Sequence, residues 1–189
     1  MQLNDVCVIQ NGQVDPTQEP YLNLFHIAPD DIESSSGRIL EFNTALQDGV
    51  SSGNYYFQPG AILYSKIRPN LRKVVRVDFE GVCSADVYPI YANKSINRDF
   101  LFYLLLSPRF TAYANTRSIR SAIPKINRDD LLAYPFDLPN LKDQVLIVHQ
   151  LDALETAILG IEAQIQHLKN IKRQVMSALL EEGSKLHVQ

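Results

Sequence analysis

Ten of the eighteen lysines and arginines lie in two short segments that contain no acidic residue. The first covers residues 66–76 (KIRPNLRKVVR) and the second covers residues 109–128 (RFTAYANTRSIRSAIPKINR). Asn, Ser, Thr and Tyr lie among the bases, and Pro69 and Pro124 favour loops. Arginine outnumbers lysine seven to three, and arginine is the side chain that binds guanine or phosphate through paired hydrogen bonds. This composition is typical of loops that bind nucleic acid.

We therefore expect both segments to contact double-stranded DNA, with some side chains holding phosphates and others reading base edges. Their spacing does not divide the residues between these two roles. The alternative is a solvated basic surface that balances acidic flanks. The candidate DNA-binding residues are Lys66, Arg68, Asn70, Arg72, Lys73, Arg76, Arg117, Ser118, Arg120, Lys125, Asn127 and Arg128.

The net charge of −3 conceals this basic block. Residues 1–50 hold eight acids and one base, residues 51–128 hold twelve bases and four acids, and residues 129–189 hold nine acids and five bases. The local field governs how a charged partner is attracted. The overall acidity therefore does not exclude a polyanion, and residues 1–50 are either solvated surface or a face for a basic partner.

The sequence offers little for catalysis or metal binding. His26, His149, His167 and His187 show no ligand spacing with Cys, Asp or Glu. There is no glycine-rich phosphate loop, no methyl-donor motif and no carboxylate cluster of a two-metal nuclease. Cys83 could act as a nucleophile, but no motif places a histidine as its base, which favours a core cysteine. We expect no catalytic residue, metal or cofactor in this chain.

The sequence also favours a cytoplasmic location. Its two cysteines, Cys7 and Cys83, are too few for a disulfide framework, which favours buried thiols in a reducing compartment. No basic stretch precedes an apolar core at the N-terminus, as a signal peptide would require. No apolar run approaches the roughly 20 residues that span a bilayer, so we expect no membrane partner.

The elements that must position the bases are short and mixed in type. A short strand is predicted in VCVIQNG, ended by Asn11 and Gly12, and a helix over residues 98–115 with a break at Pro108. This mixture over residues 1–138 indicates an α+β domain with a mixed β-sheet and helices. Three further strands are predicted at residues 61–67, 73–79 and 85–91.

A long helix is predicted after this domain. From Leu141 to Glu182 the sequence contains no proline, and Asn140 followed by Asp143 resembles a capping box. Gly183 is placed to end the helix. A helix of this length is about 63 Å long at about 1.5 Å per residue, which is too long for the preceding domain to wrap.

Apolar residues recur along this helix at alternating steps of three and four, interrupted by Lys172. A 3.5-residue period held over more than four heptads predicts a coiled-coil seam. The alternative is a helix packed on its own domain. The seam, which we expect to be a dimer interface, consists of Ile147, Leu151, Leu154, Ile158, Ile161, Ile165, Leu168, Lys172, Val175 and Leu179.

The position of Lys172 favours an antiparallel pair of helices. A parallel dimer would bury Lys172 against its own copy and would gain no ion pair in return. An antiparallel dimer with its two-fold axis near Ala163 places Lys172 against Leu154 of the second copy, and Glu155 opposite Lys169. The pattern does not distinguish neighbouring registers. Such a pair would separate two copies of the domain, as in a protein that reads two half-sites.

Five segments of the chain, taken in order, resemble the specificity subunit of type I restriction-modification systems. Together they cover essentially the whole chain, and the run from Leu138 through Gln144 is the most recognisable piece. The resemblance implies a DNA target recognition domain in residues 1–138 and a spacer and dimerisation helix in residues 139–189. The segments are PGAILYSKIRPNLRKVV, GVCSADVYPIY, FLFYLLLSPRF, RSIRSAIPKIN and LPNLKDQVLIVHQLD.

In that family one chain carries two such domains, separated by two antiparallel helices, and each domain reads one half of an interrupted DNA sequence. This chain has one domain and one helix. The resemblance therefore implies a half-size, non-catalytic homodimer that reads an interrupted palindrome and recruits methyltransferase subunits and, through them, endonuclease subunits. Two alternatives stay open: a coiled-coil adaptor whose basic domain binds an acidic protein, and a full-length subunit truncated to one half.

Overall fold

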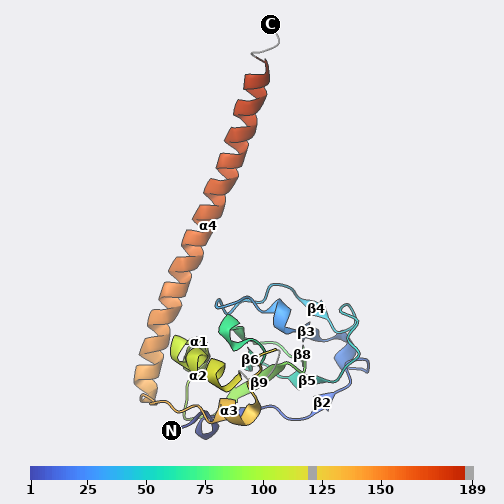
Figure 1. Ribbon diagram of the computed structural model, residues 1–189, viewed down its shortest axis with the longest axis vertical. Helices are drawn as coiled ribbons and strands as arrows, with labels where there is room; N and C mark the ends of the chain where they lie inside the picture. Colours follow the sequence, from blue (N-terminus) through green and yellow to red (C-terminus); the bar gives the residue numbers. More distant parts are fainter. Residues whose placement is uncertain (119–122, 186–189) are drawn as a thin grey trace. The chain divides into compact units, whose positions relative to one another are not determined.

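The computed structural model describes residues 1–118 and 123–185, and the chain divides into two compact units. The first unit comprises Met1–Val145, and the second begins at Leu146, inside the long C-terminal helix α4 (Leu141–Lys185) (Figure 1). The first unit contains two β-sheets and three α-helices in the part of the chain that is described. This confirms the expected α+β class with a long C-terminal helix.

A four-stranded antiparallel sheet forms the centre of the first unit. All four residues of its strand β6 are buried. Because successive side chains of a strand point to opposite sides, this strand is covered on both faces. Ile62 and Tyr64 enter one hydrophobic core, and Leu63 enters the other. In spatial order the strands are β1 (Cys7–Ile9), β9 (Val87–Ala92), β6 (Ile62–Ser65) and β7 (Val74–Arg76).

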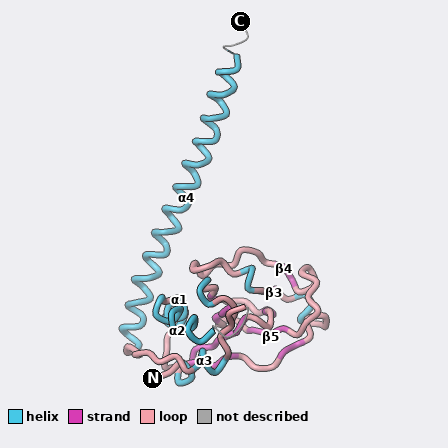
Figure 2. The backbone as a smooth tube through the Cα atoms, viewed as in Figure 1, coloured by secondary structure: helices cyan, strands magenta, loops and turns pink. Residues whose placement is uncertain are grey.

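A second sheet of five strands shares a core with one face of this sheet. Ile27, Phe57 and Cys83 from the second sheet pack with Leu63 and Val75 from the first. The strands are only two to four residues long and are joined by long loops (Figure 2). In spatial order they are β2 (Gln13–Val14), β5 (Asn54–Phe57), β8 (Gly81–Cys83), β3 (Phe25–Ile27) and β4 (Asn43–Thr44), with β3 parallel to β8.

Helices cover the other face of the four-stranded sheet. Phe110 is buried against Tyr64 with 5.6 Å between the ring centroids. The helix predicted over residues 98–115 does break at Pro108, because Ser107 is extended and Pro108 begins a new helix. The helices are α1 (Arg98–Leu106), α2 (Pro108–Ser118) and α3 (Arg128–Leu132). Short 3-10 helices lie at η1 (Leu3–Asp5), η2 (Tyr21–Asn23), η3 (Pro29–Asp31) and η4 (Pro69–Leu71).

Helix α4 begins where its cap predicts and continues past its expected end. The Asn140 side-chain oxygen accepts a hydrogen bond from the backbone N–H of Asp143 at 3.1 Å. The Asp143 carboxylate accepts from the Asn140 side-chain amide at 2.6 Å, not from the backbone as in a capping box. The expected stop at Gly183 is wrong, because α4 reaches Lys185. Glycine weakens a helix by about 1 kcal/mol but does not by itself end one.

Gln144 fixes the first turn of α4 to the start of α1. Its side chain is fully buried. The side-chain oxygen accepts from the backbone N–H of Asn97 at 2.7 Å, and the side-chain nitrogen donates to the carbonyl of Pro139 at 2.8 Å. Asn97 is itself the N-cap of α1. One carboxamide therefore satisfies two backbone groups at the junction of α1 and α4.

Gln144→Ala should lower the free energy of unfolding by roughly 1–3 kcal/mol for each backbone group left without a partner. The matched control is Gln150→Ala on the same helix, where the side chain is exposed and the change should stay within about 0.5 kcal/mol. Urea denaturation followed by circular dichroism measures both. Equal stability of the two variants would show that Gln144 has no such anchoring role.

Candidate nucleic-acid interface

The fold brings the two basic segments together. The backbone N–H of Arg68 donates to the carbonyl of Pro124 at 2.8 Å, and that of Ile126 donates to the carbonyl of Lys66 at 2.9 Å. These bonds form an antiparallel bridge between residue 67 and residue 125. Two stretches more than 50 positions apart in the sequence thus share one surface.

The loop between β6 and β7 has an unusual backbone. Arg68 and Arg72 flank η4 and both adopt the left-handed conformation, with φ of 47° and 50°. This conformation is rare for residues other than glycine and costs roughly 1–2 kcal/mol each. Pro69 is buried beneath the loop, and the carbonyl of Arg72 accepts from the N–H of Ser35 at 3.2 Å. The fold therefore holds two arginines in strained positions, as functional sites often do.

Three of the predicted bases in the first segment are committed to the fold. The Lys66 ammonium donates to the carbonyl of Ala85, and the Lys73 ammonium donates to the carbonyl of Pro29 at 2.7 Å. Both lysine side chains are only 14% exposed. The Arg76 guanidinium pairs with Asp99 at 3.0 Å and lies over the Phe102 ring at 4.3 Å. These contacts tie the side chains of Lys66, Lys73 and Arg76 to neighbouring parts of the domain.

The second segment also contains residues that serve the fold. Arg128 donates to the carbonyls of Ile9 and Gln10, which ties α3 to the end of β1. Asn127 is the N-cap of α3. Ser118 is buried, and its hydroxyl donates to the carbonyl of Asn115 at 3.0 Å. Arg120 lies outside the described residues.

Arg117 and Lys125 combine an ion pair with substantial exposure. Arg117 lies 3.5 Å from Asp130 and is 51% exposed. Lys125 lies 2.9 Å from Asp86 and is 46% exposed. Exposed ion pairs of this kind contribute little, about 0–1 kcal/mol, so both cations can exchange a carboxylate for a phosphate at small cost.

Arg68, Asn70 and Arg72 differ from the other predicted residues. Within the described parts of the chain, none of their side chains makes a hydrogen bond or ion pair. Arg68 and Asn70 are exposed, and Arg72 is half-buried. They form the part of the predicted site that is free to bind a ligand.

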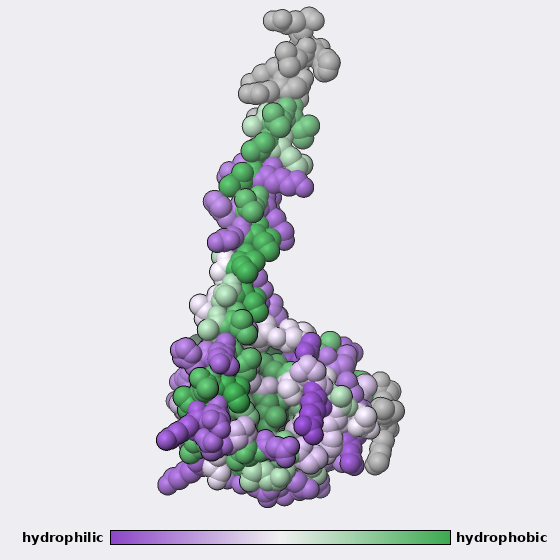
Figure 3. All heavy atoms as spheres, turned by 90° about the vertical axis from the view of Figure 1, so that its left-hand side faces the viewer, coloured by the Kyte–Doolittle hydropathy of each residue, from purple (hydrophilic) through white to green (hydrophobic). Residues whose placement is uncertain are grey.

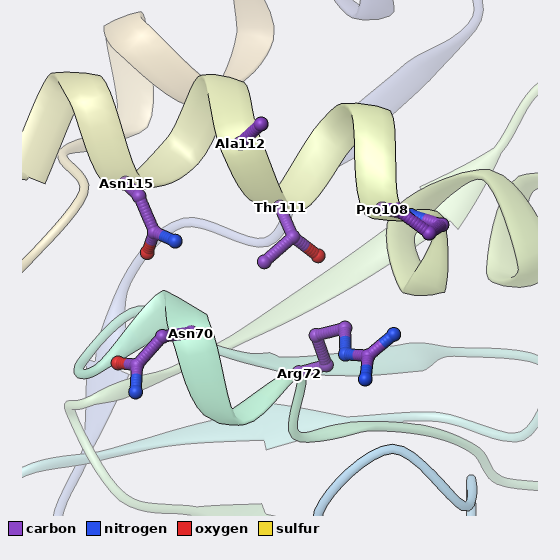
Figure 4. Close-up of a pocket in the computed structure, with 6 residues that line it drawn as sticks. All are labelled: Asn70, Arg72, Pro108, Thr111, Ala112 and Asn115. Carbon is purple, nitrogen blue, oxygen red and sulfur yellow. The ribbon is translucent and has the colours of Figure 1, made fainter.

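An open groove of about 390 Å³ separates η4 from α2. Asn70 and Arg72 lie on one side of it, and Thr111 and Asn115 point toward it from α2 (Figure 4). Pro108 and Ala112 complete the lining. Sequence reasoning missed Thr111 and Asn115. Their spacing of four residues places them on one face of a helix, next to the buried face that carries Phe110 and Ala114.

Asp86 lies where the two basic segments meet. It pairs with Lys125 and also lies 3.4 Å from Lys66. Burial opposes ionisation of this carboxyl, but the hydrogen bond from Lys125 and the charges of both lysines outweigh it, so the pKa of Asp86 lies below its usual range. The ionised carboxylate holds two cations at the base of the bridge.

Two groups of residues outside the basic segments carry side chains suited to catalysis or metal binding. Cys83 is fully buried, and burial raises the pKa of its thiol, so it presents no accessible thiolate near neutral pH.

The fold brings together His26, Asp31 and Asp48, which no spacing rule indicated. Here the Nδ1 atom of His26 lies 2.7 Å from the Asp48 carboxylate. Asp31 accepts from a backbone N–H at 2.7 Å. The bond between His26 and Asp48 ties the loop after β4 to β3.

A family model described as type I restriction modification DNA specificity domain matches residues 1–170. The chain belongs to this family. It is 42% identical to the type I restriction enzyme EcoDI specificity subunit of Escherichia coli over 147 residues. The matched region covers 78% of this chain and 33% of that protein. It is 28% identical to the type I restriction enzyme MjaVIII specificity subunit of Methanocaldococcus jannaschii over 91 residues, and this matched region covers 48% of this chain and 21% of that protein.

Solved structures show the same fold. The HsdS subunit from Thermoanaerobacter tengcongensis superposes with a TM-score of 0.71 at 25% identity, covering 85% of this chain and 43% of that chain. A chain from a structure of a type I R-M system superposes with a TM-score of 0.76 at 23% identity, covering 96% of this chain and 48% of that chain. This member of the specificity family thus spans a third or less of these curated relatives and just under half of these solved chains.

Asp86→Asn should destabilise the specificity domain at neutral pH, because it removes the charge that holds Lys66 and Lys125. A carboxyl with a lowered folded pKa contributes stability above its unfolded value of about 3.9, and that contribution is lost as pH falls through the folded pKa. The difference in unfolding midpoint between wild type and variant should therefore shrink below about pH 4. A difference that stays constant from pH 7 to pH 3 would contradict this assignment.

Proposed function

We propose that this chain is a non-catalytic DNA-binding specificity subunit of a cytoplasmic type I restriction-modification system. The observation that carries the proposal is the loop 68–72, which presents Arg68, Asn70 and Arg72 without partners in the described residues. Membership of the specificity family supports this reading of the loop. In this proposal the subunit directs methyltransferase subunits, and through them endonuclease subunits, to the DNA site.

The side-chain contacts support fewer DNA-binding residues than the twelve that the sequence predicts. Arg68, Asn70 and Arg72 form its centre, and the exposed Arg117 and Lys125 extend it across the bridge. Because phosphate contacts dominate affinity for DNA, a few available cations on a rigid frame suit this role. The residues that support the surface by fixing the loops that carry it are Lys66, Lys73, Arg76, Asn127 and Arg128.

Helix α4 supplies the second part of the proposal. It contains 45 residues, about 68 Å at 1.5 Å per residue, and hydrophobic side chains form a stripe along it (Figure 3). Exposed apolar surface of this extent marks an interaction site. Of the predicted seam, Ile147 and Leu151 are half-buried. The exposed seam residues are Leu154, Ile158, Ile161, Ile165, Leu168, Lys172, Val175 and Leu179.

We propose that a second copy of α4 covers this stripe in antiparallel orientation. That orientation pairs Ile158 with Leu168 of the second copy and avoids burying Lys172 against itself. The two recognition domains would then read identical half-sites in opposite directions, which gives an interrupted palindrome.

By length and composition α4 also qualifies as a membrane-spanning helix, with a mean hydropathy of 1.2 over an 18-residue window of Leu141–Leu180. A helix that lies in lipid is apolar around its whole circumference, whereas a coiled-coil helix is apolar along one stripe. The charged residues Glu155, Glu162 and Lys169 lie directly after the seam residues Leu154, Ile161 and Leu168. Charged residues at this spacing along the helix favour a helical partner over lipid.

The double substitution Arg68→Ala with Arg72→Ala should weaken binding to duplex DNA. It should also reduce the slope of log K against log salt by about 1 for each phosphate that these arginines neutralise. Lys94→Ala with Lys142→Ala removes the same charge from exposed positions outside the loop and should leave the slope close to that of wild type. Fluorescence anisotropy at several salt concentrations measures both. Equal binding by the two double variants would contradict the role of the loop, and a wild-type chain with no DNA affinity would favour the adaptor that binds an acidic protein.

Ile158→Glu should convert a dimer into a monomer at micromolar concentration, because it places a charge in the centre of the seam. Gln166→Glu adds the same charge beside the seam and should leave the dimer intact. Sedimentation velocity separates the two states. A wild-type monomer would refute pairing with a second copy.

The orientation can be tested by mixing the single variants Ile158→Cys and Leu168→Cys under oxidising conditions. Antiparallel pairing predicts a disulfide between the two different variants, whereas a parallel pair predicts disulfides within each variant alone.

A further inference from the structure

The groove between η4 and α2 contains polar groups whose function is not explained by the fold. Asn70 lines it from η4, and Asn115 lines it from α2 and points toward η4 (Figure 4). Within the described residues, neither carboxamide makes a hydrogen bond. Asn115 is half-buried, and its amide has no hydrogen-bond partner among residues 1–118 and 123–185. Both carboxamides are therefore available to a ligand that enters the groove.

The chemistry of the lining narrows the class of ligand. A carboxamide carries one acceptor oxygen and one donor nitrogen, so it matches an edge that offers both a donor and an acceptor. A phosphate offers only acceptors. Adenine presents the N6 amino donor and the N7 acceptor in the major groove of DNA, and Asn binds this pair through two hydrogen bonds. No carboxylate lines the groove among the described residues, so an approaching DNA strand meets the Arg72 side chain and no negative charge.

The shape of the groove is also compatible with close approach of a base. The α2 face toward it consists of Pro108, Thr111, Ala112 and Asn115, spaced so that they share one side of the helix. These side chains are short, and the Thr111 hydroxyl is turned back to the carbonyl of Ser107 at 2.9 Å. Across the groove, η4 is held by its buried Pro69 and by the bridge at residue 67. The two amides are therefore presented on rigid elements.

We propose that Asn70 and Asn115 read adenine in the DNA half-site, at the groove between η4 and α2. This inference rests on the proposed DNA-binding function and assigns a base type to part of the site. Arg68 and Arg72 supply attraction to the DNA strand, and the carboxamides supply selectivity. Asn115 is a specificity-determining residue that lies outside the candidate set based on sequence.

The test is selection from a pool of duplex DNA with randomised positions by the full chain, followed by sequencing. Asn115→Ala should lose preference for adenine at one position of the half-site, where removal of a bidentate hydrogen-bonded pair reduces discrimination by roughly 5- to 150-fold, and should keep the preferences elsewhere. Asn70→Ala should do the same at its own position. The control is Thr116→Ala. Thr116 is exposed on α2 outside the groove lining, so this variant should select the same sequence as wild type.

Asn115→Asp covers the case in which the alanine variant does not fold. Its carboxylate has the shape of the amide but lacks the donor, so preference should move from adenine toward cytosine. Unchanged adenine preference in the folded variants would overturn the assignment, and so would an even loss of affinity for all sequences, which is the mark of a phosphate contact. A wild-type chain that selects no sequence would instead overturn the proposed function.

Discussion

The candidate site depends on the short backbone bridge between residues 66–68 and 124–126. This bridge joins the loop after β6 to the segment that follows α2. The bridge and the direct packing of η4 against α2 together set the two sides of one groove. Because the loop carries two non-glycine residues in the left-handed conformation, surrounding contacts must hold it against its own preference. Asp86 and the two lysines beside it provide part of that support.

The predictable parts of the structure were those with a clear period. The proline-free stretch after the Asn140 cap placed α4 almost to its ends, and runs of β-branched and aromatic residues between turn residues located β6, β7 and β9 within a few residues. Strands such as β2, β4 and β8 contain two or three residues, too few to show a period. Their pairing depends on contacts distant in sequence, which no local pattern contains.

The candidate site was predictable at the level of segments and not of individual side chains. A cluster of bases without acids located the surface loops that meet at the bridge. Composition could not show that Arg128 binds the end of β1 or that Lys73 binds the carbonyl of Pro29, because these partners lie far away in the chain. Asn115 was overlooked because it falls in a segment predicted to be helical, where a polar residue needs no special explanation.

In the proposed assembly, a recognition domain reads one half-site through its loop, and the uncovered stripe of its long helix pairs with a second copy. The central claim is that two identical domains read DNA with two-fold symmetry. The most direct measurement is co-expression of the chain with a methyltransferase subunit encoded beside it, followed by mapping of methylated positions in genomic DNA. Two-fold symmetry predicts one motif made of two identical inverted halves separated by unspecified bases. A motif with two different halves, or with a single uninterrupted half, would contradict it.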